Sequence, residues 1–270
     1  MRQNIPLAHG YLKYYIEATI FRNRSKGLMR YGIISDIHGN LEALEAVFKE
    51  LEKQDLDKIL CLGDVIGYGP DPEECVALVR SRADIILAGN HDYAPLGLVD
   101  TSFFNIYAKT AVEWTASRLS DETRTFLEQC PLRAEFENFT IVHATPSRPE
   151  AWNYILSIDD AVENFPHFKG QVCFIGHSHV PLIIEEKSDG RILVHRKNMV
   201  RCDSESRYII NVGSVGQPRD LNPRAACALF DSERLEYELL RVEYEVGMTQ
   251  RKILDRGLPA FLAERLALGQ

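Results

Sequence analysis

The sequence predicts an α/β protein that begins with strands of a parallel sheet and continues into a second sheet. Three short apolar runs, at residues 31–35, 58–62 and 85–87, each end at a polar motif, and helical segments separate them. Strands that alternate with helices favour a largely parallel sheet, whose functional loops gather where the strands end. Beyond residue 138 most predicted elements are strands, which indicates a second sheet. A chain of 270 residues suits one domain with a single sizeable core.

The helices of the first half are predicted from apolar spacing and from end signals. An apolar stripe at spacings of three and four marks a helix directly after the first polar motif: Leu41, Leu44, Val47, Phe48 and Leu51. Pro72 suits the first turn of a second helix, which runs through Arg80. Residues 106–119, and a segment that starts at Ser120 and stops before Pro131, are predicted to be helical and to form a cap beside the functional loops.

The second half of the chain is predicted to contain mainly strands. Short apolar or alternating runs mark them at residues 139–142, 172–175, 191–194, 208–210, 227–230 and 235–239. A capping box at residues 157–160 opens a short helix that reaches Phe165, and residues 248–268 are predicted to form a helical tail that breaks near residues 257–259.

Composition excludes some classes of function. The formal net charge of −8 disfavours the broad basic surface of a nucleic-acid-binding protein, so a nucleic acid is not an expected partner. The six cysteines are scattered without a paired spacing, which predicts reduced core residues rather than disulfides or a thiolate zinc site. No apolar run approaches the roughly 20 residues that span a bilayer. We therefore expect a cytoplasmic protein with no membrane partner; the sequence assigns no oligomeric state.

Residues 1–28 differ in charge from the rest of the chain. Five basic residues in this segment face a single acidic one, Glu17, and a second methionine, Met29, follows. We expect an N-terminal extension that is disordered or that precedes the true start at Met29, ahead of one domain over residues 29–270. An Arg-containing, acid-poor leader is also typical of a transit peptide, and an ordered docking helix is the third alternative.

The polar motifs contain a set of metal-binding residue types. Five of the eight histidines fall directly after apolar strands, beside Gly, Asp or Asn: His38, His91, His143, His177 and His179. Asp36 and His38 are two residues apart, as are His177 and His179, and in extended backbone this spacing places both side chains on one side. Asp64 and Asn90 each follow a glycine and add oxygen donors. Such mixed ligands suit Mn, Fe, Mg or Zn and leave positions open for water and substrate, which predicts a catalytic metal centre.

Taken together and in this order, the motifs resemble those of the calcineurin-like metallophosphoesterase superfamily. The resemblance covers roughly residues 31–230 and rests on five segments: Asp36-x-His38, Gly63-Asp64, Gly89-Asn-His-Asp92, His143 after a strand, and Gly176-His-Ser-His179. Three further segments are similar to its small bacterial and archaeal phosphodiesterase branch: Gly67-Tyr-Gly-Pro-Asp71, Val142-His-Ala-Thr-Pro146 and Asn211-Val-Gly-Ser-Val-Gly-Gln-Pro-Arg219.

The resemblance implies a four-layer α/β/β/α sandwich with two mixed sheets and two divalent metal ions. It places Asp36, His38, Asp64 and His179 on one ion, and Asp64, Asn90, His143 and His177 on the other. Asp64 bridges both. Mn²⁺ is the expected metal, with Fe, Zn, Ni or Mg as alternatives. The implied reaction is in-line attack on phosphorus by a hydroxide that the two ions activate.

Several nearby residues are candidates for other roles. His91 adjoins Asn90 without being an expected ligand, so it is the candidate that protonates the leaving oxygen. Enzymes of the protein phosphatase and symmetrical dinucleoside tetraphosphatase groups carry an Arg-Gly pair after the Gly-Asp motif, which this chain lacks. Arg219 is therefore the candidate that grips the substrate phosphate, and Tyr68 is a candidate to stack on the substrate or cover the pocket. Trp152 and Tyr154 form a substrate platform or pack locally.

These observations predict a phosphodiesterase or phosphatase that acts on a small phosphoester, such as a nucleotide. Four alternatives share the fold: a protein phosphatase, a dinucleoside polyphosphate hydrolase, a nuclease and a non-catalytic scaffold. The acidic composition disfavours the nuclease, and the complete set of ligand types together with His91 disfavours the scaffold.

Overall fold

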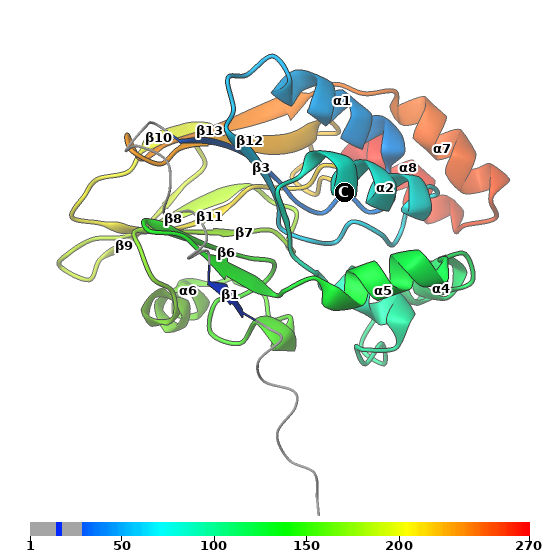
Figure 1. The fold of residues 1–270 in the computed structure, drawn as a ribbon, viewed down its shortest axis with the longest axis horizontal. Helices are drawn as coiled ribbons and strands as arrows, with labels where there is room; N and C mark the ends of the chain where they lie inside the picture. Colours follow the sequence, from blue (N-terminus) through cyan, green and yellow to red (C-terminus); the bar gives the residue numbers. More distant parts are fainter. Residues whose placement is uncertain (1–14, 18–28) are drawn as a thin grey trace, which may run out of the picture.

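The computed structural model describes residues 15–17 and 29–270, and it shows two β-sheets stacked between layers of helices (Figure 1). The first sheet has the strand order β10-β13-β12-β2-β3-β4. Its strands are β2 (Arg30–Ile34), β3 (Lys58–Cys61), β4 (Ile85–Ile86), β10 (Met199–Arg201), β12 (Ala225–Asp231) and β13 (Glu236–Val242). Strands β2, β3 and β4 are parallel to one another, and β12 joins them antiparallel to β2.

The second sheet has the order β1-β5-β6-β7-β11-β8-β9. Its strands are β1 (Tyr15–Glu17), β5 (Arg133–Glu135), β6 (Phe139–Val142), β7 (Val172–Ile175), β8 (Leu182–Glu186), β9 (Ile192–His195) and β11 (Arg207–Asn211). Strands β6, β7 and β11 are parallel to one another. Strand β5 is parallel to β1 and antiparallel to β6, and β8 pairs antiparallel with both β11 and β9. Both sheets are therefore mixed, as predicted.

Helices cover the outer face of each sheet. Helices α1 (Leu41–Leu51) and α2 (Pro72–Arg82) pack on the first sheet, and α7 (Val246–Asp255) and α8 (Ala260–Leu268) lie beside them (Figure 1). Helix α6 (Ile158–Asn164) covers the second sheet. The short α3 (Asn90–Tyr93), α4 (Ile106–Ala116) and α5 (Asp121–Gln129) lie at one end of the sandwich. The four-layer α/β/β/α arrangement is confirmed.

The largest apolar cluster fills the space between the two sheets. Phe139 and Phe174 of the second sheet meet Phe230 of the first, with edge-on ring contacts between 4.8 and 5.8 Å. These aromatic pairs are fully buried, so they fix how the sheets stack and therefore how the loops at their ends meet. Separate clusters join α1 and α2 to the first sheet and α6 to the second.

Some elements differ from those expected. Strands β5, β8 and β10 were not predicted, because each is short, partly polar or next to a proline. Strands β12 and β13 were expected to belong to the second sheet, but they extend the first, since β12 pairs with β2 over Ala228–Asp231. Of the N-terminal segment, the structure describes only β1, which lies parallel to β5 at a sheet edge; the remaining expectations for residues 1–28 lie outside the described residues.

Helix α7 is joined to α1 by buried polar contacts. Asn40 caps α1 by accepting from the Ala43 main-chain N–H and also accepts from the hydroxyl of Thr249 in α7 at 3.0 Å. Lys252 and Arg256 both contact the buried carboxylate of Asp71, at 2.9 and 3.0 Å. The C-terminal helices are thereby fixed against the loops that follow β2 and β3. Within the described part of the chain, no helix has the length and hydropathy needed to cross a membrane.

Candidate metal centre

The predicted ligands converge at the end of the sandwich where the parallel strands of both sheets terminate. Asp36 follows β2, Asp64 follows β3 and Asn90 begins α3 after β4, all from the first sheet. His143 follows β6 and the pair His177 and His179 follows β7, from the second sheet. Their side chains are all buried. The stacking of two sheets thus brings together residues that are far apart in the sequence.

The donor atoms form two overlapping groups. Asp36, His38, Asp64 and His179 offer one group, and Asp64, His143 and His177 offer the other, with ligand atoms within 4.8 Å of one another in each. His143 Nε2 lies 3.3 Å from Asp64 Oδ2, and His179 Nε2 lies 3.3 Å from Asp36 Oδ1. Asp64 is the only residue shared by the two groups among the described residues, which is the position that the resemblance implies for a bridging carboxylate.

The four imidazoles are oriented by main-chain carbonyl oxygens. His38, His143 and His179 each donate from Nδ1, to the carbonyls of Ile66 at 3.2 Å, Leu62 at 3.0 Å and Gln217 at 2.6 Å. His177 donates from Nε2 to the Trp152 carbonyl at 2.9 Å. Because a carbonyl can only accept, each contact fixes the proton on that nitrogen and leaves a lone pair on the other. Histidines that ligate metals are held in this way.

The acceptor atoms that point into the centre are arranged to bind a cation, and their contacts with one another are unfavourable in its absence. The unprotonated Nε2 atoms of His38 and His179 face each other at 3.0 Å, and two lone pairs at that distance repel. The buried Nε2 of His143 and Oδ1 of Asn90 have no hydrogen-bond partner. Unpaired buried acceptors that all point to one centre are costly unless a cation satisfies them. The residues present therefore fit two divalent metal ions.

The backbone at the ligands is left-handed, which corrects one expectation. Asp36, His38, His177 and His179 have φ values of 54°, 51°, 66° and 61°, and Asp64 has 53°. The spacing of two residues predicted that the two pairs converge from extended backbone. Instead, each member of a pair sits in the sparsely populated region with positive φ, with one ordinary residue between them. The side chains still converge, but through tight turns at the strand ends.

Two glycines let the loops approach closely enough for this arrangement. A Cβ placed on Gly89 would lie 2.6 Å from the main-chain nitrogen of Asp64, and closer still to its Oδ1. A Cβ on Gly176 would lie against the side chains of Ser35 and Asp36. Any side chain at either position would displace a metal-ligand carboxylate. The requirement at these glycines is for space rather than for unusual φ, since neither has positive φ.

Asp92 supports the centre from behind and was not assigned a role from the sequence. Its Oδ2 accepts from the main-chain N–H of Asp64 at 2.7 Å and of Gly89 at 2.8 Å. Its Oδ1 accepts from Val65 at 2.8 Å and Ile66 at 3.2 Å. The carboxylate therefore holds the loop of the bridging Asp64 to the loop of Asn90. The sequence signal that could have indicated this role is the position of Asp92 inside the Gly89-Asn-His-Asp92 motif.

The electrostatics favour anionic carboxylates beside mostly neutral imidazoles. Burial raises the pKa of Asp36, but the neighbouring His179 and His143 lower it below its usual range overall. Burial lowers the pKa of His177 to about 3 and depresses that of His38. Although burial also lowers the pKa of His143, the adjacent Asp64 raises it to about 9. The buried carboxylates thus concentrate negative charge at the centre, as a cation site requires.

His91 lies against the metal centre without facing its donor atoms as a ligand. Its main-chain N–H donates to Asp64 Oδ1 at 2.7 Å, and its ring packs 5.0 Å from that of His38. The ring is further enclosed by Tyr68 at 4.4 Å and by Phe104 at 5.1 Å. Its Nδ1 is buried without a hydrogen bond, which leaves Nε2 as the nitrogen able to meet a substrate.

The predicted substrate residues lie at the edge of the same centre. Tyr68 is buried, with φ of 58°, and packs 4.8 Å from the His38 ring. The guanidinium of Arg219 lies 5.7 Å from the Tyr68 ring centroid. Tyr154 stacks on His177 at 4.0 Å and is 45% exposed, so of the two platform candidates it presents a free face. Trp152 instead packs against Tyr93.

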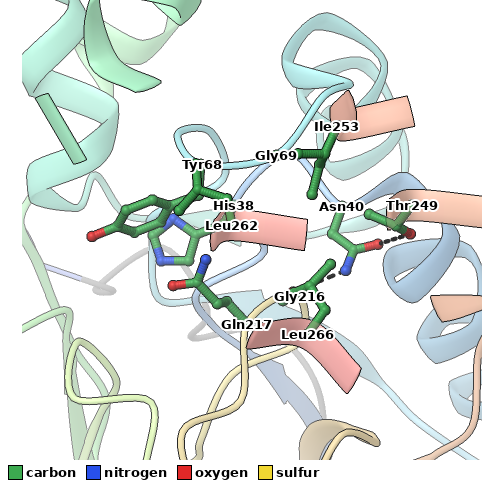
Figure 2. A pocket seen from close by; sticks show the side chains of 10 residues that line it. All are labelled: His38, Asn40, Tyr68, Gly69, Gly216, Gln217, Thr249, Ile253, Leu262 and Leu266. Carbon is green, nitrogen blue, oxygen red and sulfur yellow. Dashed lines mark hydrogen bonds between the residues drawn. The ribbon is translucent and has the colours of Figure 1, made fainter. Parts of the chain in front are cut away.

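A small pocket behind the ligands is not the substrate site. It has a volume of about 10 Å³ and lies between His38, Tyr68 and Gln217 on one side and Leu262 and Leu266 of α8 on the other (Figure 2). That volume has room for about one water molecule. Leu262 and Leu266 of α8 pack in one apolar cluster with Tyr68.

Comparisons with known proteins agree with this geometry. Residues 29–234 match the calcineurin-like phosphoesterase superfamily domain. The chain is 40% identical, over 88% of its length and 97% of the relative, to an uncharacterized protein of Methanocaldococcus jannaschii. It is 42% identical to a metallophosphoesterase of Sphaerobacter thermophilus, over 90% of this chain and 100% of that one, with a TM-score of 0.80. A hypothetical protein of Pyrococcus horikoshii shares the fold at 18% identity, with a TM-score of 0.70 and coverage of 90% and 99%. These relatives are bacterial and archaeal, as the motifs predicted, and the chain belongs to the calcineurin-like phosphoesterase superfamily.

Proposed function

We propose that the protein is a metal-dependent hydrolase of a small phosphodiester or phosphomonoester. The observation that carries the proposal is the pair of donor groups that share Asp64. The imidazoles of both groups are fixed by carbonyls, so their free lone pairs point inward. A structural metal site would be closed by its ligands, whereas overlapping mixed N/O sites beside an exposed tyrosine leave room for substrate.

The proposed division of labour among residues follows the two donor groups. When bound, two divalent cations, for which we propose Mn²⁺, would lower the pKa of a water molecule and neutralise charge on the phosphoryl oxygens. Asp36, His38 and His179 would hold one cation, and Asn90, His143 and His177 the other, with Asp64 between them. Asp92 keeps Asp64 in place through the main chain.

His91 is proposed to protonate the leaving oxygen of the substrate. It is buried beside Asp64 and packed by Tyr68 and Phe104, so its ring position is fixed without a metal. Arg219 is proposed to bind a phosphate group of the substrate, since its guanidinium presents a planar set of donors that match phosphate geometry. Tyr68 holds that guanidinium near the centre.

A dinucleoside polyphosphate is a second candidate substrate. Over 122 residues, 42% of this chain, the sequence is 31% identical to a symmetrical bis(5'-nucleosyl)-tetraphosphatase of Psychromonas ingrahamii. The Arg-Gly pair expected of that group after Gly63-Asp64 is absent, because Val65 and Ile66 follow directly. The local likeness favours a nucleotide as substrate class, and the missing arginine disfavours the same mode of phosphate binding.

The test is hydrolysis of bis-p-nitrophenyl phosphate and p-nitrophenyl phosphate by chelator-stripped protein, with and without added Mn²⁺. We expect turnover only with metal, and loss of that turnover in Asp64→Asn because both donor groups lose their shared carboxylate. Asp255→Asn, at an exposed position in α7, is the matched control and should behave as the wild type. Folded, metal-loaded protein that hydrolyses neither ester nor any nucleotide would favour a non-catalytic scaffold.

A further inference from the structure

Two arginines near the metal centre have no side-chain carboxylate partner among the described residues. Arg219 and Arg265 are each partly buried, yet neither forms an ion pair in that part of the chain. Arg124 and Arg207, which are also partly buried, each donate from more than one guanidinium nitrogen to main-chain carbonyls. Arg133 and Arg241 are paired with carboxylates, Arg133 with Glu135 at 2.7 Å and Arg241 with Asp220. Partly buried guanidinium groups are usually paired in this way.

Arg219 is held rigidly to the loop of a metal ligand. Its main-chain N–H donates to the carbonyl of His179 at 3.3 Å, and its Nη2 donates to Gln217 Oε1 at 2.9 Å. The carbonyl of the same Gln217 orients the His179 ring. The Arg219 Nε atom is buried without a hydrogen bond. The guanidinium is therefore positioned in advance, with one donor still unsatisfied.

Arg265 is brought to the same place by the C-terminal helix. The Leu221 main-chain N–H donates to the carbonyl of Gly269 at 2.9 Å, which joins the loop of Arg219 to the end of α8. Leu262 and Leu266, which flank Arg265 on α8, pack in one cluster with Tyr68 (Figure 2).

The guanidinium of Arg265 has donors available. Its Nε donates to the Gln270 carbonyl, and its terminal nitrogens have no partner among the described residues. It lies 5.3 Å from the ring of Phe261, which stacks on Tyr107 of α4 at 4.5 Å. Burial and the positive charge of Arg219 together lower the pKa of Arg265 to about 10. Tyr68 lies beside both arginines, because its ring is 5.7 Å from the Arg219 guanidinium and packs with the two leucines that flank Arg265.

We propose that Arg219 and Arg265 form an anion site, next to the metal centre, that binds a second phosphate group of the substrate. Two neighbouring guanidinium groups without a carboxylate are stabilised when an anion lies between them, and their planar donors suit phosphate oxygens. The substrate class is therefore a phosphoester that carries a further phosphate, such as a nucleoside polyphosphate. This inference rests on the proposed function, because the scissile phosphate is assigned to the metal centre.

The site also assigns a role to helix α8, which lies wholly outside the matched family domain. Residues 29–234 match that domain, whereas Arg265 and the leucines that pack behind Tyr68 follow it. The catalytic metal ligands come from the common fold, and one wall of the substrate site comes from the C-terminal extension. Selectivity for a second phosphate can then change without altering the metal centre.

The test measures binding, independently of turnover. Titration calorimetry compares inorganic phosphate with pyrophosphate, each added to Mn²⁺-loaded protein, with free Mn²⁺ held equal in both solutions because pyrophosphate chelates it. We expect the wild type to bind pyrophosphate at least about 10-fold more tightly, and Arg265→Gln to lose about 10-fold of that preference, as for a charge-assisted hydrogen bond. Arg265→Lys should retain part of it. Arg251→Gln, exposed on α7, should match the wild type.

The outcomes separate this inference from the proposed function. Equal affinity for the two anions in the wild type, or an unchanged preference in a folded Arg265→Gln protein, would overturn the second-phosphate site. Equal weakening of both anions would also overturn it, because Arg265 would then bind the scissile phosphate. A lost preference in Arg265→Gln would support the site even if the wild type hydrolyses no p-nitrophenyl ester, a result that would count against the proposed function alone.

Discussion

Replacing Gly89 with alanine tests whether the position of Asp64 controls both metal sites. Gly89 has φ −105° and ψ 177°, a conformation that alanine adopts without strain. The added Cβ would lie 2.6 Å from the main-chain nitrogen of Asp64, against 3.4–4 Å for an ordinary contact. The main-chain contact falls short of an ordinary contact by about 0.8 Å, so the two loops must separate by at least that distance. The Oδ1 atom of Asp64 is closer still to the added Cβ and must move further.

The expected effect on function exceeds the effect on folding. Overpacking of this kind costs about 1–3 kcal/mol of stability, which a domain of this size tolerates. A displacement of nearly 1 Å at a reacting centre costs about 10²-fold in rate, and here it affects both metal sites because Asp64 is shared. We expect Gly89→Ala to fold, to bind Mn²⁺ more weakly at both sites and to lose about 10²-fold in kcat/KM.

The assay combines Mn²⁺ titration calorimetry, hydrolysis of bis-p-nitrophenyl phosphate and urea unfolding. Gly247→Ala is the control, since the nearest atom to its added Cβ is 3.7 Å away and alanine raises helix stability by up to about 1 kcal/mol. It should retain wild-type metal binding and activity. A Gly89→Ala protein that binds two Mn²⁺ ions with wild-type affinity and turns over at the wild-type rate would refute the reasoning.

Three further predictions concern the groups around the centre and one remote cluster. His91→Ala should bind Mn²⁺ normally but lose roughly 10²–10⁴-fold in kcat, as expected for loss of a proton donor, measured by calorimetry and steady-state kinetics. Asp92→Asn should lower the free energy of unfolding by about 3 kcal/mol in urea, because its amide NH₂ would face main-chain N–H donors that now have a carboxylate. Glu185→Gln should lower the free energy of unfolding by about 2 to 3 kcal/mol at pH 7. Burial raises the pKa of the Glu185 carboxyl, but hydrogen bonds from Lys187 and Tyr208 lower it overall from 4.5 to about 2.

The stability that Glu185 contributes depends on pH over a defined range. A carboxyl whose folded pKa is lowered contributes stability above its unfolded value of 4.5 and loses it as pH falls toward 2. The difference between wild type and Glu185→Gln should therefore shrink over that range, and a constant difference would contradict it. Glu186→Gln and Asp255→Asn serve as neighbouring and exposed controls. Wild-type kcat in metal-loaded His91→Ala would rule out His91 as the proton donor. Wild-type stability of Asp92→Asn would contradict the supporting role of the Asp92 carboxylate.

Much of the metal centre could be predicted because its residue types are informative in any conformation. Asp36, Asp64 and the histidine pair after β7 were recognisable from donor chemistry and from their positions after apolar runs. The order of parallel strands then placed them at one edge. The local backbone could not be predicted in this way, because left-handed φ at a non-glycine residue is imposed by the surrounding fold.

Other features depend on contacts between distant segments. Strand β8 follows Pro181 and contains two glutamates, so its pattern resembles a loop until it pairs with β11. Arg265 carries no motif. It is brought toward Arg219 by the hydrogen bond between Leu221 and Gly269 and by the packing of the α8 leucines against Tyr68. The carbonyls that orient the histidines are also invisible in the sequence, since every residue has one.

The left-handed turns at the predicted ligands lower the stability of the fold at the residues that metal binding requires. Nine non-glycine residues of the described chain have positive φ, and six of them are Asp36, His38, Asp64, Tyr68, His177 and His179. Each such residue costs on the order of 1 kcal/mol, so together they approach the whole free energy of folding of a typical domain, about 5–15 kcal/mol. Glycine at any of the five ligands would relieve strain and abolish a metal contact. Selection or engineering for thermal tolerance alone would therefore erode the candidate metal centre first, and safe stabilising substitutions lie in the sheets and outer helices.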